Sequence, residues 1–293
     1  AKRKKNITPQ EEEENTGQRR EETRSLCFST VNAYCFPEAL ATLLKFVANV
    51  DLHPRTSLSV ANRLVLLAVN LRQSLSDVVC LQEVWCTKNK KKLVGLVEDV
   101  YPYHAYDKSF SARAFGVGID SGLLVLSKFP ILKSAAYPFE EYTKGSEELF
   151  SKKGVLCAQI EAGGPHQVVV VANTHLQSGG EEQGTETRKK QVREMGASVD
   201  RFVEECFEGI IDPGGESRAA SVVAMGDFNT RAFFRTDTQQ WDVSEKAYIE
   251  EIFATFSSKL SYRSMHDVLP RPSDRRSRHT VRCMCNFRLI LYF

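Results

Sequence analysis

The stretch that decides the fold reads VVVVANTH at residues 168–175, where five apolar residues run directly into three polar ones. A continuous apolar run of this length is typical of a β-strand that is buried on both faces. Residues 78–83 (VVCLQE) and 222–229 (VVAMGDFN) repeat the pattern, with an apolar run followed by polar side chains. Strands of this kind occur in layered α/β proteins, so the sequence predicts a sheet covered by helices.

The α/β pattern continues on both sides of these three strands. Apolar residues recur at helical spacing after Pro37, between Val60 and Leu71, and between Arg188 and Phe207, which predicts three helices. Further strands are predicted where apolar or β-branched residues cluster, at residues 25–33, 122–127, 131–137 and 155–160.

Length and composition bound the possible classes of protein. A chain of 293 residues, of which 42% are hydrophobic and 26% charged, is long enough for one large α/β domain with a buried core. No apolar run approaches the roughly 20 residues that cross a bilayer, and the first residues do not form a signal peptide. We therefore expect a cytoplasmic or peripheral membrane protein.

Charge and cysteine usage divide the chain further. Residues 1–24 alternate basic and acidic clusters with almost nothing apolar, so we expect a disordered tail. The whole chain has a formal net charge of +2, and residues 271–293 contain six Arg and one Asp, so the first 270 residues carry a charge of −3. This charge does not suggest a strongly basic nucleic-acid surface. The eight cysteines lack the spacing of a disulfide framework, so we expect reduced thiols.

Polar residues at the ends of the three strands are the candidates for chemistry. They are Glu83, His175, Asp227 and Asn229, and ligands of layered α/β folds collect at the carboxyl ends of strands. A hard divalent cation prefers carboxylate oxygens, and a phosphoryl group prefers hydrogen-bond donors. Each residue also has a structural explanation: a helix cap, a core histidine or an Asx turn. Taken together, they favour a catalytic site.

Four segments resemble the endonuclease/exonuclease/phosphatase superfamily, in the same order along the chain. They are TVNAYCFP at residues 30–37, LQEVW at 81–85, NTHLQ at 173–177 and GDFNT at 226–230. The resemblance implies a DNase I-like α/β fold, a four-layer sandwich of two packed mixed β-sheets flanked by helices, with a phosphodiesterase domain over residues 25–270.

The same resemblance implies roles for the candidate residues. Asn32 and Glu83 would bind Mg²⁺, His175 and Asn229 would contact the phosphoryl oxygens, and Asp227 would help to position the attacking water. The metal would spread the charge that builds on the phosphoryl oxygens and on the leaving alkoxide.

Three further segments look like those of neutral sphingomyelinases. They are YPY at residues 101–103, SGLLVLSKFPI at 121–131 and FSKKGVL at 150–156. Residues 224–231 lack the flanking aromatics of the inositol polyphosphate 5-phosphatases. The resemblance implies a sphingomyelin phosphodiesterase, which releases ceramide and a phosphorylated headgroup from a phospholipid or sphingolipid substrate at a membrane surface. A nuclease or another phosphatase is the alternative, and nucleic acid is disfavoured by the acidic body.

The C-terminal part of the sequence departs from the superfamily. Its last strand should carry an Asp-His pair in which the His is the general base, but His266 is followed by Asp267 and His279 does not follow an apolar strand. Residues 282–293 (RCMCNFRLILYF) resemble nothing in the family. We therefore expect missing or altered C-terminal strands and an atypical basic tail over residues 271–293, as truncation or mis-splicing would produce. A catalytically inactive binding module is the corresponding alternative.

Overall fold

The computed structural model describes most of the predicted domain. It covers residues 26–36, 58–107, 120–143, 151–162, 168–179, 182–207 and 221–229, and the backbone of residues 232–235, 240–243, 263–264 and 291–292. The helix expected after Pro37, the tail over residues 1–24, and His266 and His279 lie outside the described residues.

The first sheet has four strands in the order β1-β2-β4-β3. Strand β1 (Phe28–Asn32) runs parallel to β2 (Val78–Gln82), whereas β4 (Leu124–Ser127) is antiparallel to β2 and to β3 (Tyr103–Tyr106). Strand β2 is buried along its whole length, as its apolar sequence predicts.

The second sheet has six strands in the order β11-β12-β8-β7-β6-β5. Its four long strands are β5 (Ile131–Pro138), β6 (Gly154–Glu161), β7 (Val168–His175) and β8 (Ser221–Asp227), of which β7 and β8 are parallel.

The edge of the second sheet next to β8 is formed by two very short strands. These are β12 (Leu291–Tyr292) and β11 (Arg263–Ser264), and Leu291 pairs with Ala224 of β8. Two residues of the predicted C-terminal tail therefore extend the sheet. Strands β9 (Ala232–Arg235) and β10 (Gln240–Val243) form a separate antiparallel pair.

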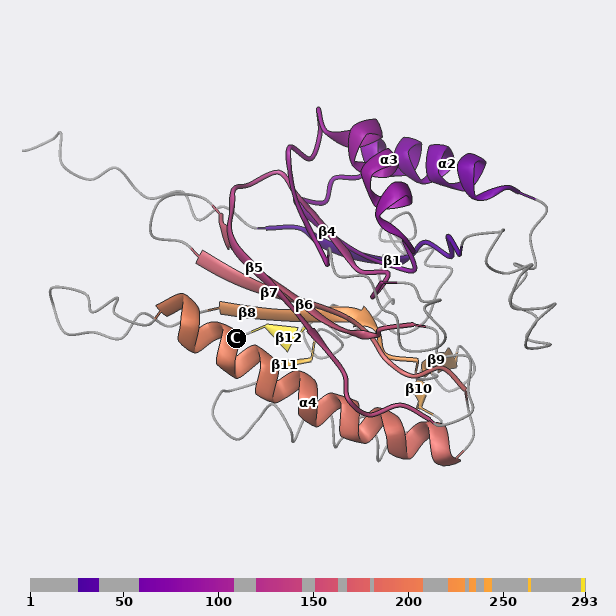
Figure 1. The fold of residues 1–293 in the computed structure, drawn as a ribbon, viewed down its shortest axis with the longest axis vertical. Helices are drawn as coiled ribbons and strands as arrows, with labels where there is room; N and C mark the ends of the chain where they lie inside the picture. The colour runs from indigo at the N-terminus through magenta and orange to yellow at the C-terminus, as the bar shows by residue number, and fades with distance from the viewer. Residues whose placement is uncertain are drawn as a thin grey trace, which may run out of the picture.

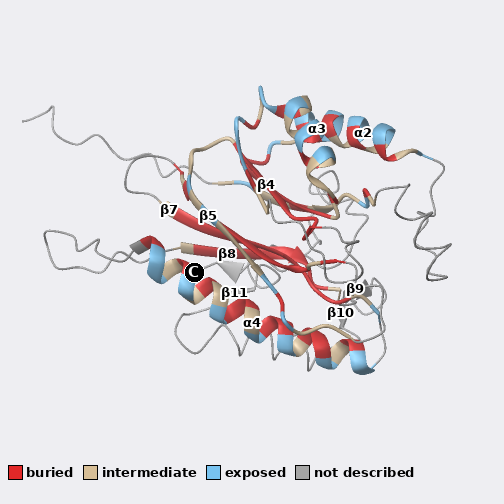
Figure 2. Ribbon diagram, in the orientation of Figure 1, coloured by how far each residue is buried: buried red, intermediate tan, exposed pale blue. Residues whose placement is uncertain are grey.

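In the described part of the chain, three helices cover the outer faces of the two sheets, which gives four layers (Figure 1). Helices α2 (Val60–Gln73) and α3 (Thr87–Val97) lie on the first sheet, and α4 (Glu182–Phe207) lies on the second. Their buried faces point toward the sheets (Figure 2). A third apolar cluster joins the two sheets face to face. The expected four-layer sandwich of mixed sheets is thus confirmed.

Six elements of the described fold were not expected from the sequence, namely α3, β3, β9, β10, β11 and β12, and one helix is longer than expected. Helix α3 has the sequence TKNKKKLVGLV, whose lysine run hides the short apolar face formed by Leu93 and Val97. Strand β3 has only four residues, and its sequence YHAY has no apolar run. Helix α4 begins at Glu182, whereas the sequence predicted a start at Arg188. Its first turns are mainly polar, so they show no apolar periodicity in the sequence.

The described residues include neither a helix that could span a bilayer nor a disulfide. No helix in this part of the chain is both long and apolar enough to span a bilayer. The six described cysteines are free thiols.

Gly226 allows the parallel strands β7 and β8 to approach each other beside the candidate site. Its φ is 150°, and a Cβ atom there would lie 2.0 Å from the carbonyl oxygen of Thr174. We expect Gly226→Ala to lower the free energy of unfolding by about 3 kcal/mol or more, because the contact involves backbone that must shift. Chemical denaturation measures this change.

Gly95 on α3 provides the matched control, because a Cβ atom there would meet nothing within 4 Å. Gly95→Ala should stabilise the protein by up to about 1 kcal/mol through helix propensity. Equal effects of the two substitutions would contradict the role assigned to Gly226.

Candidate active site

The structure brings all five predicted site residues to one edge of the two sheets. Asn32 ends β1, and Glu83 directly follows β2. His175 and Asp227 end β7 and β8, where they are paired in register, and Asn229 follows two residues later. The carboxyl ends of the two parallel strand pairs therefore meet, as the strand-end pattern predicts.

Strand alternation explains why these side chains face one another. In β7, Val169 and Val171 belong to the apolar cluster between the sheets, and His175 lies on the same face of that strand. In β8, Val223 and Met225 precede Asp227 on the corresponding face. The side chains between the two sheets are therefore apolar along most of the strands and polar at this edge.

The Asn32 amide connects the two sheets at the centre of the site. Its Nδ2 donates to Glu83 Oε1 at 2.7 Å, and to Asp227 Oδ2 at 2.9 Å across the sheet interface. Its Oδ1 accepts the backbone N–H of Tyr34 at 3.0 Å. Two carboxylates from different sheets therefore converge on one polar group.

Two of the site residues have a left-handed backbone, which is uncommon for residues other than glycine. The φ angles are 57° at Glu83 and 49° at Asn229. The Asn229 conformation is held by its N–H, which donates to Asp227 Oδ1 at 2.9 Å, and by its Nδ2, which donates to the Leu176 carbonyl at 2.8 Å. Residues in such conformations cluster at functional sites, where surrounding contacts hold them in place.

Lys153 is a site residue that the list of candidates missed. Its Nζ lies 3.3 Å from Nε2 of His175 and donates to the Leu176 carbonyl at 2.8 Å, although only 7% of the residue is exposed. Nε2 of His175 also lies 3.8 Å from Asp227 Oδ2. The Lys-Gly step at the start of β6 was the only signal in the sequence, and it did not show that this lysine is buried.

The Asp227 carboxylate is kept ionised by its neighbours. Burial alone would raise its pKa, but the His175 ring, the Asn32 amide, the Asn229 N–H and the Lys153 ammonium together hold the pKa below its usual value. Asp227 is therefore a buried anion at neutral pH, and it can accept hydrogen bonds or attract a cation.

Gln82 and Asn173, two other polar residues at strand ends, connect the sheets instead of facing a ligand. Gln82 Nε2 donates to Asn173 Oδ1 at 2.7 Å, and both side chains are buried. Asn173 Nδ2 donates to the carbonyls of Leu81 and Leu124 in the opposite sheet, at 3.0 and 3.2 Å. These bonds hold the end of β2, and hence Glu83, beside β7.

The donor set at this edge suits a hard divalent cation. In the described part of the chain, no group of three His, Cys, Asp or Glu residues is arranged to hold a metal ion. Mg²⁺ does not require such a group, because one or two carboxylates are sufficient while it keeps several waters. The carboxylates of Glu83 and Asp227 already converge on the Asn32 side chain, which donates to both. The residues present therefore fit magnesium.

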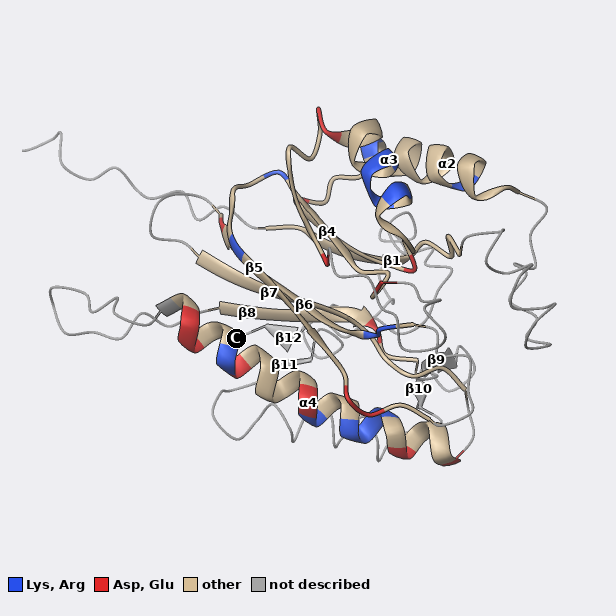
Figure 3. Cartoon of the chain, viewed as in Figure 1, with Lys and Arg blue, Asp and Glu red and all other residues tan. Residues whose placement is uncertain are grey.

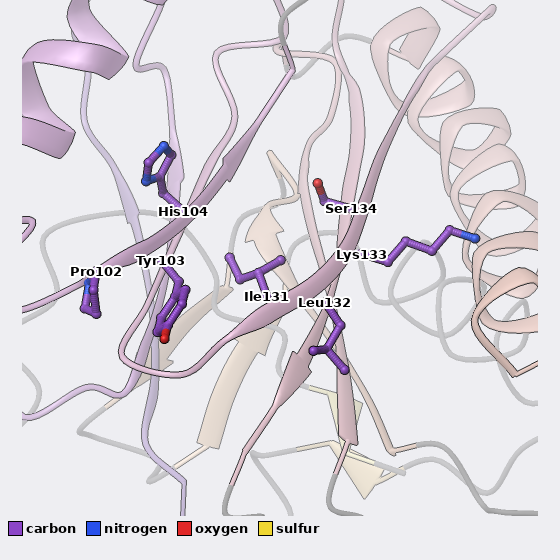
Figure 4. Close-up of a pocket in the computed structure, with 7 residues that line it drawn as sticks. All are labelled: Pro102, Tyr103, His104, Ile131, Leu132, Lys133 and Ser134. Carbon is purple, nitrogen blue, oxygen red and sulfur yellow. The ribbon is translucent and has the colours of Figure 1, made fainter. Parts of the chain in front are cut away.

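A hollow elsewhere in the molecule does not belong to this site. It has a volume of about 320 Å³ and lies between β3 and β5 (Figure 4), lined by Pro102, Tyr103, His104, Ile131, Leu132, Lys133 and Ser134. Ile131 pairs with Ile160 near the end of β6, whereas the candidate site is beside the start of that strand. The hollow therefore lies at the opposite end of the strands.

Comparison with known sequences matches the chain to one protein family. The model of the Endonuclease/Exonuclease/phosphatase family matches residues 30–255, which include every candidate site residue. A neutral sphingomyelinase homologue of Drosophila melanogaster is 36% identical over 104 residues, which are 34% of this chain and 22% of the homologue. The chain thus matches only about a fifth of that relative's length.

Solved structures show the same fold at low sequence identity. A mutant beta toxin from Staphylococcus aureus with bound magnesium ions is 18% identical, with a TM-score of 0.55 over 80% of this chain and 70% of the toxin. Sphingomyelinase C from Streptomyces griseocarneus is 20% identical, with a TM-score of 0.53 over 80% of this chain and 70% of that enzyme. At these identities the likeness establishes the fold alone.

Proposed function

Because this chain belongs to the Endonuclease/Exonuclease/phosphatase family, whose members are hydrolases acting on phosphodiester bonds, we propose that it is a magnesium-dependent sphingomyelin phosphodiesterase. The observation that carries the proposal is the Asn32 amide, which bonds Glu83 of one sheet and Asp227 of the other beside His175. This arrangement supports the proposal because the residues proposed to bind the metal and those proposed to bind the phosphoryl group lie close together.

Asn32 and Glu83 would hold Mg²⁺ in this proposal. When bound, the cation would offset the negative charge that develops on the phosphoryl oxygens. His175 and Asn229 would donate to those oxygens, and Lys153 would add a buried positive charge beside His175. Asp227 would accept a hydrogen bond from the attacking water and so orient it.

The reaction replaces one phosphorus–oxygen bond by another. The water oxygen bonds to phosphorus while the bond from phosphorus to the ceramide oxygen breaks. One proton of the water remains with the hydroxyl on the phosphorylated headgroup, and the other ends on the ceramide oxygen. The residues above would position the water and stabilise the charge in between.

Surface character supports a lipid substrate over a nucleic acid. Val65, Leu66 and Val69 expose an apolar face on α2, and α3 exposes Lys88, Lys91 and Lys92 in the same outer layer (Figure 3). Apolar side chains beside basic ones suit the boundary of a lipid surface. The names of the Drosophila and Streptomyces relatives point the same way.

A non-catalytic binding module is the second candidate function. One observation favours it: of the two histidines in the described residues, only His175 lies at the site, and His104 lines the hollow at the other end. Such a module would bind magnesium and a phospholipid without turnover.

A substrate panel tests the proposal. The full chain is incubated with Mg²⁺ and sphingomyelin, inositol phosphosphingolipid or abasic DNA in parallel, with EDTA as the metal-free control. We expect release of phosphorylated headgroup from a sphingolipid, which EDTA abolishes. Cleavage of DNA alone would favour a nuclease. Magnesium binding without any turnover would favour the binding module.

A further inference from the structure

The peptide unit that joins Leu176 to Gln177 lies at the centre of the candidate site. Its carbonyl oxygen accepts hydrogen bonds from Lys153 Nζ and from Asn229 Nδ2, both at 2.8 Å. Lys153 directly precedes β6 and Asn229 follows β8, so the two donors come from different strands of the second sheet. One backbone oxygen therefore orients two side chains to which the proposed function assigns a role.

The direction of this carbonyl decides where the two side chains point. The Asn229 amide group is planar and carries two N–H bonds, so the bond of one to the Leu176 carbonyl fixes the direction of the other. The Lys153 ammonium lies 3.3 Å from His175 Nε2 while it donates to the same carbonyl. A rotation of the peptide unit would therefore redirect both donors.

Gln191 holds the opposite side of the same peptide unit. Its Oε1 accepts the N–H of Gln177 at 2.8 Å, and its Nε2 donates to the Glu141 carbonyl at 2.8 Å. Because a peptide unit is planar, its N–H and C=O groups cannot turn independently. A fixed acceptor at the Gln177 N–H therefore also fixes the direction of the Leu176 carbonyl.

The rigidity of α4 makes Gln191 suitable for this task. Gln191 is buried, and the neighbouring Val192, Met195 and Val199 of the same helix belong to the apolar cluster on the second sheet. Its side-chain amide is bonded at both the oxygen and the nitrogen, which sets its orientation from two sides. Support of this kind from a packed helix keeps the residues of a site in place.

We propose that Gln191 is a positioning residue for phosphodiester hydrolysis, and that it acts through the 176–177 peptide unit on Asn229 and Lys153. Donors that are misdirected by a small rotation lose much of their effect on the developing charge. The inference rests on the proposed function for the roles of Asn229 and Lys153. The hydrogen-bonded connection from Gln191 to Asn229 does not depend on that function and can be tested separately.

Two substitutions of Gln191 test its effect on turnover of sphingomyelin vesicles. Gln191→Met keeps the length of the side chain but removes the acceptor of the buried Gln177 N–H. We expect kcat to fall by about tenfold or more, while KM and the magnesium affinity stay within about twofold. Gln191→Glu keeps an oxygen acceptor at the same place, so its kcat should stay within about threefold of normal. Steady-state kinetics and calorimetric titration of magnesium give these values.

Glu194→Met is the matched control on the same helix. Glu194 accepts the N–H groups of Glu140 and Glu141 at 2.8 and 3.1 Å, so it holds the same segment to α4 as Gln191 does. Neither bond involves the 176–177 peptide unit, so this variant should have a lower Tm but a normal kcat. An equal loss of kcat in Glu194→Met and Gln191→Met would overturn the proposal, because Gln191 would then act only by anchoring that segment. Normal kcat in Gln191→Met would also overturn it.

Hydrogen exchange of the Asn229 side-chain amide tests the connection without turnover. Nuclear magnetic resonance of the full chain labelled with ¹⁵N-asparagine follows this group, whose signal is identified by its absence in Asn229→Asp. Exchange should be slow in the unmodified chain and in Glu194→Met, and at least about tenfold faster in Gln191→Met. Unchanged exchange in Gln191→Met would overturn the proposal. Faster exchange in a chain that hydrolyses no phosphodiester would support the connection and contradict the proposed function.

Discussion

Glu83→Gln is expected to lower magnesium-dependent phosphodiester hydrolysis by roughly 10²-fold or more, and to weaken magnesium binding. The substitution keeps the shape of the side chain but removes the negative charge of the carboxylate that faces Asn32. Mg²⁺ prefers charged oxygen ligands, and an amide replaces such a ligand poorly. Turnover at several magnesium concentrations, together with calorimetric titration of the metal, measures both effects.

Glu161→Gln is the control for this substitution. Glu161 ends β6 at the end of the sheet away from the site, where it pairs with Val168. Its replacement should change neither turnover nor the magnesium affinity. Normal activity and normal metal affinity in Glu83→Gln would show that the metal ligand lies elsewhere. The metal titration also separates an inactive binding module from a misplaced site, because it does not require turnover.

His175→Ala and Asn229→Ala are each expected to lower the turnover number by about 10²–10³-fold, because each removes a donor aimed at developing phosphoryl charge. For His175 the expected loss includes the disturbance of Lys153, whose Nζ lies 3.3 Å from the ring. For Asn229 it includes the loss of the bond from Nδ2 to the Leu176 carbonyl. Steady-state kinetics on lipid vesicles gives the turnover number, and magnesium binding should remain close to normal.

His104→Ala is the matched histidine control. His104 lies on β3 beside the hollow at the far end of the sheets (Figure 4), so its removal should leave turnover unchanged. If His175→Ala and Asn229→Ala kept normal turnover, the reacting phosphoryl group would be bound somewhere other than this edge. A loss in which both variants also bound vesicles poorly would indicate a lipid-binding role instead.

The grouping of the candidate residues could be predicted where strand position alone determines it. Glu83, His175 and Asp227 follow or end apolar runs, and parallel strands bring their carboxyl ends to one edge. The sequence therefore contained enough information to place these residues together once the order of the strands was assumed from the family resemblance. The geometry supports the grouping, while the catalytic roles of these residues remain proposals for the experiments above.

Residues whose role depends on contacts between distant segments could not be assigned in this way. Gln82 and Asn173 occupy strand ends just as Glu83 and His175 do, yet they connect the two sheets. Lys153 lies 22 residues from His175 in the chain, and its burial depends on packing of the loop before β6. Arg63 has the helical spacing of a surface residue, but its guanidinium is buried.

The sequence by itself determined the buried strands, two of the three described helices and the edge at which polar side chains collect. It could do so because burial is encoded locally, as apolar runs in strands and as helical periodicity. The tertiary structure alone decided which polar groups face a ligand, which ones join the sheets and which charge is left without a partner. Those outcomes depend on the register and separation of two sheets, and no local pattern specifies how side chains from distant segments meet.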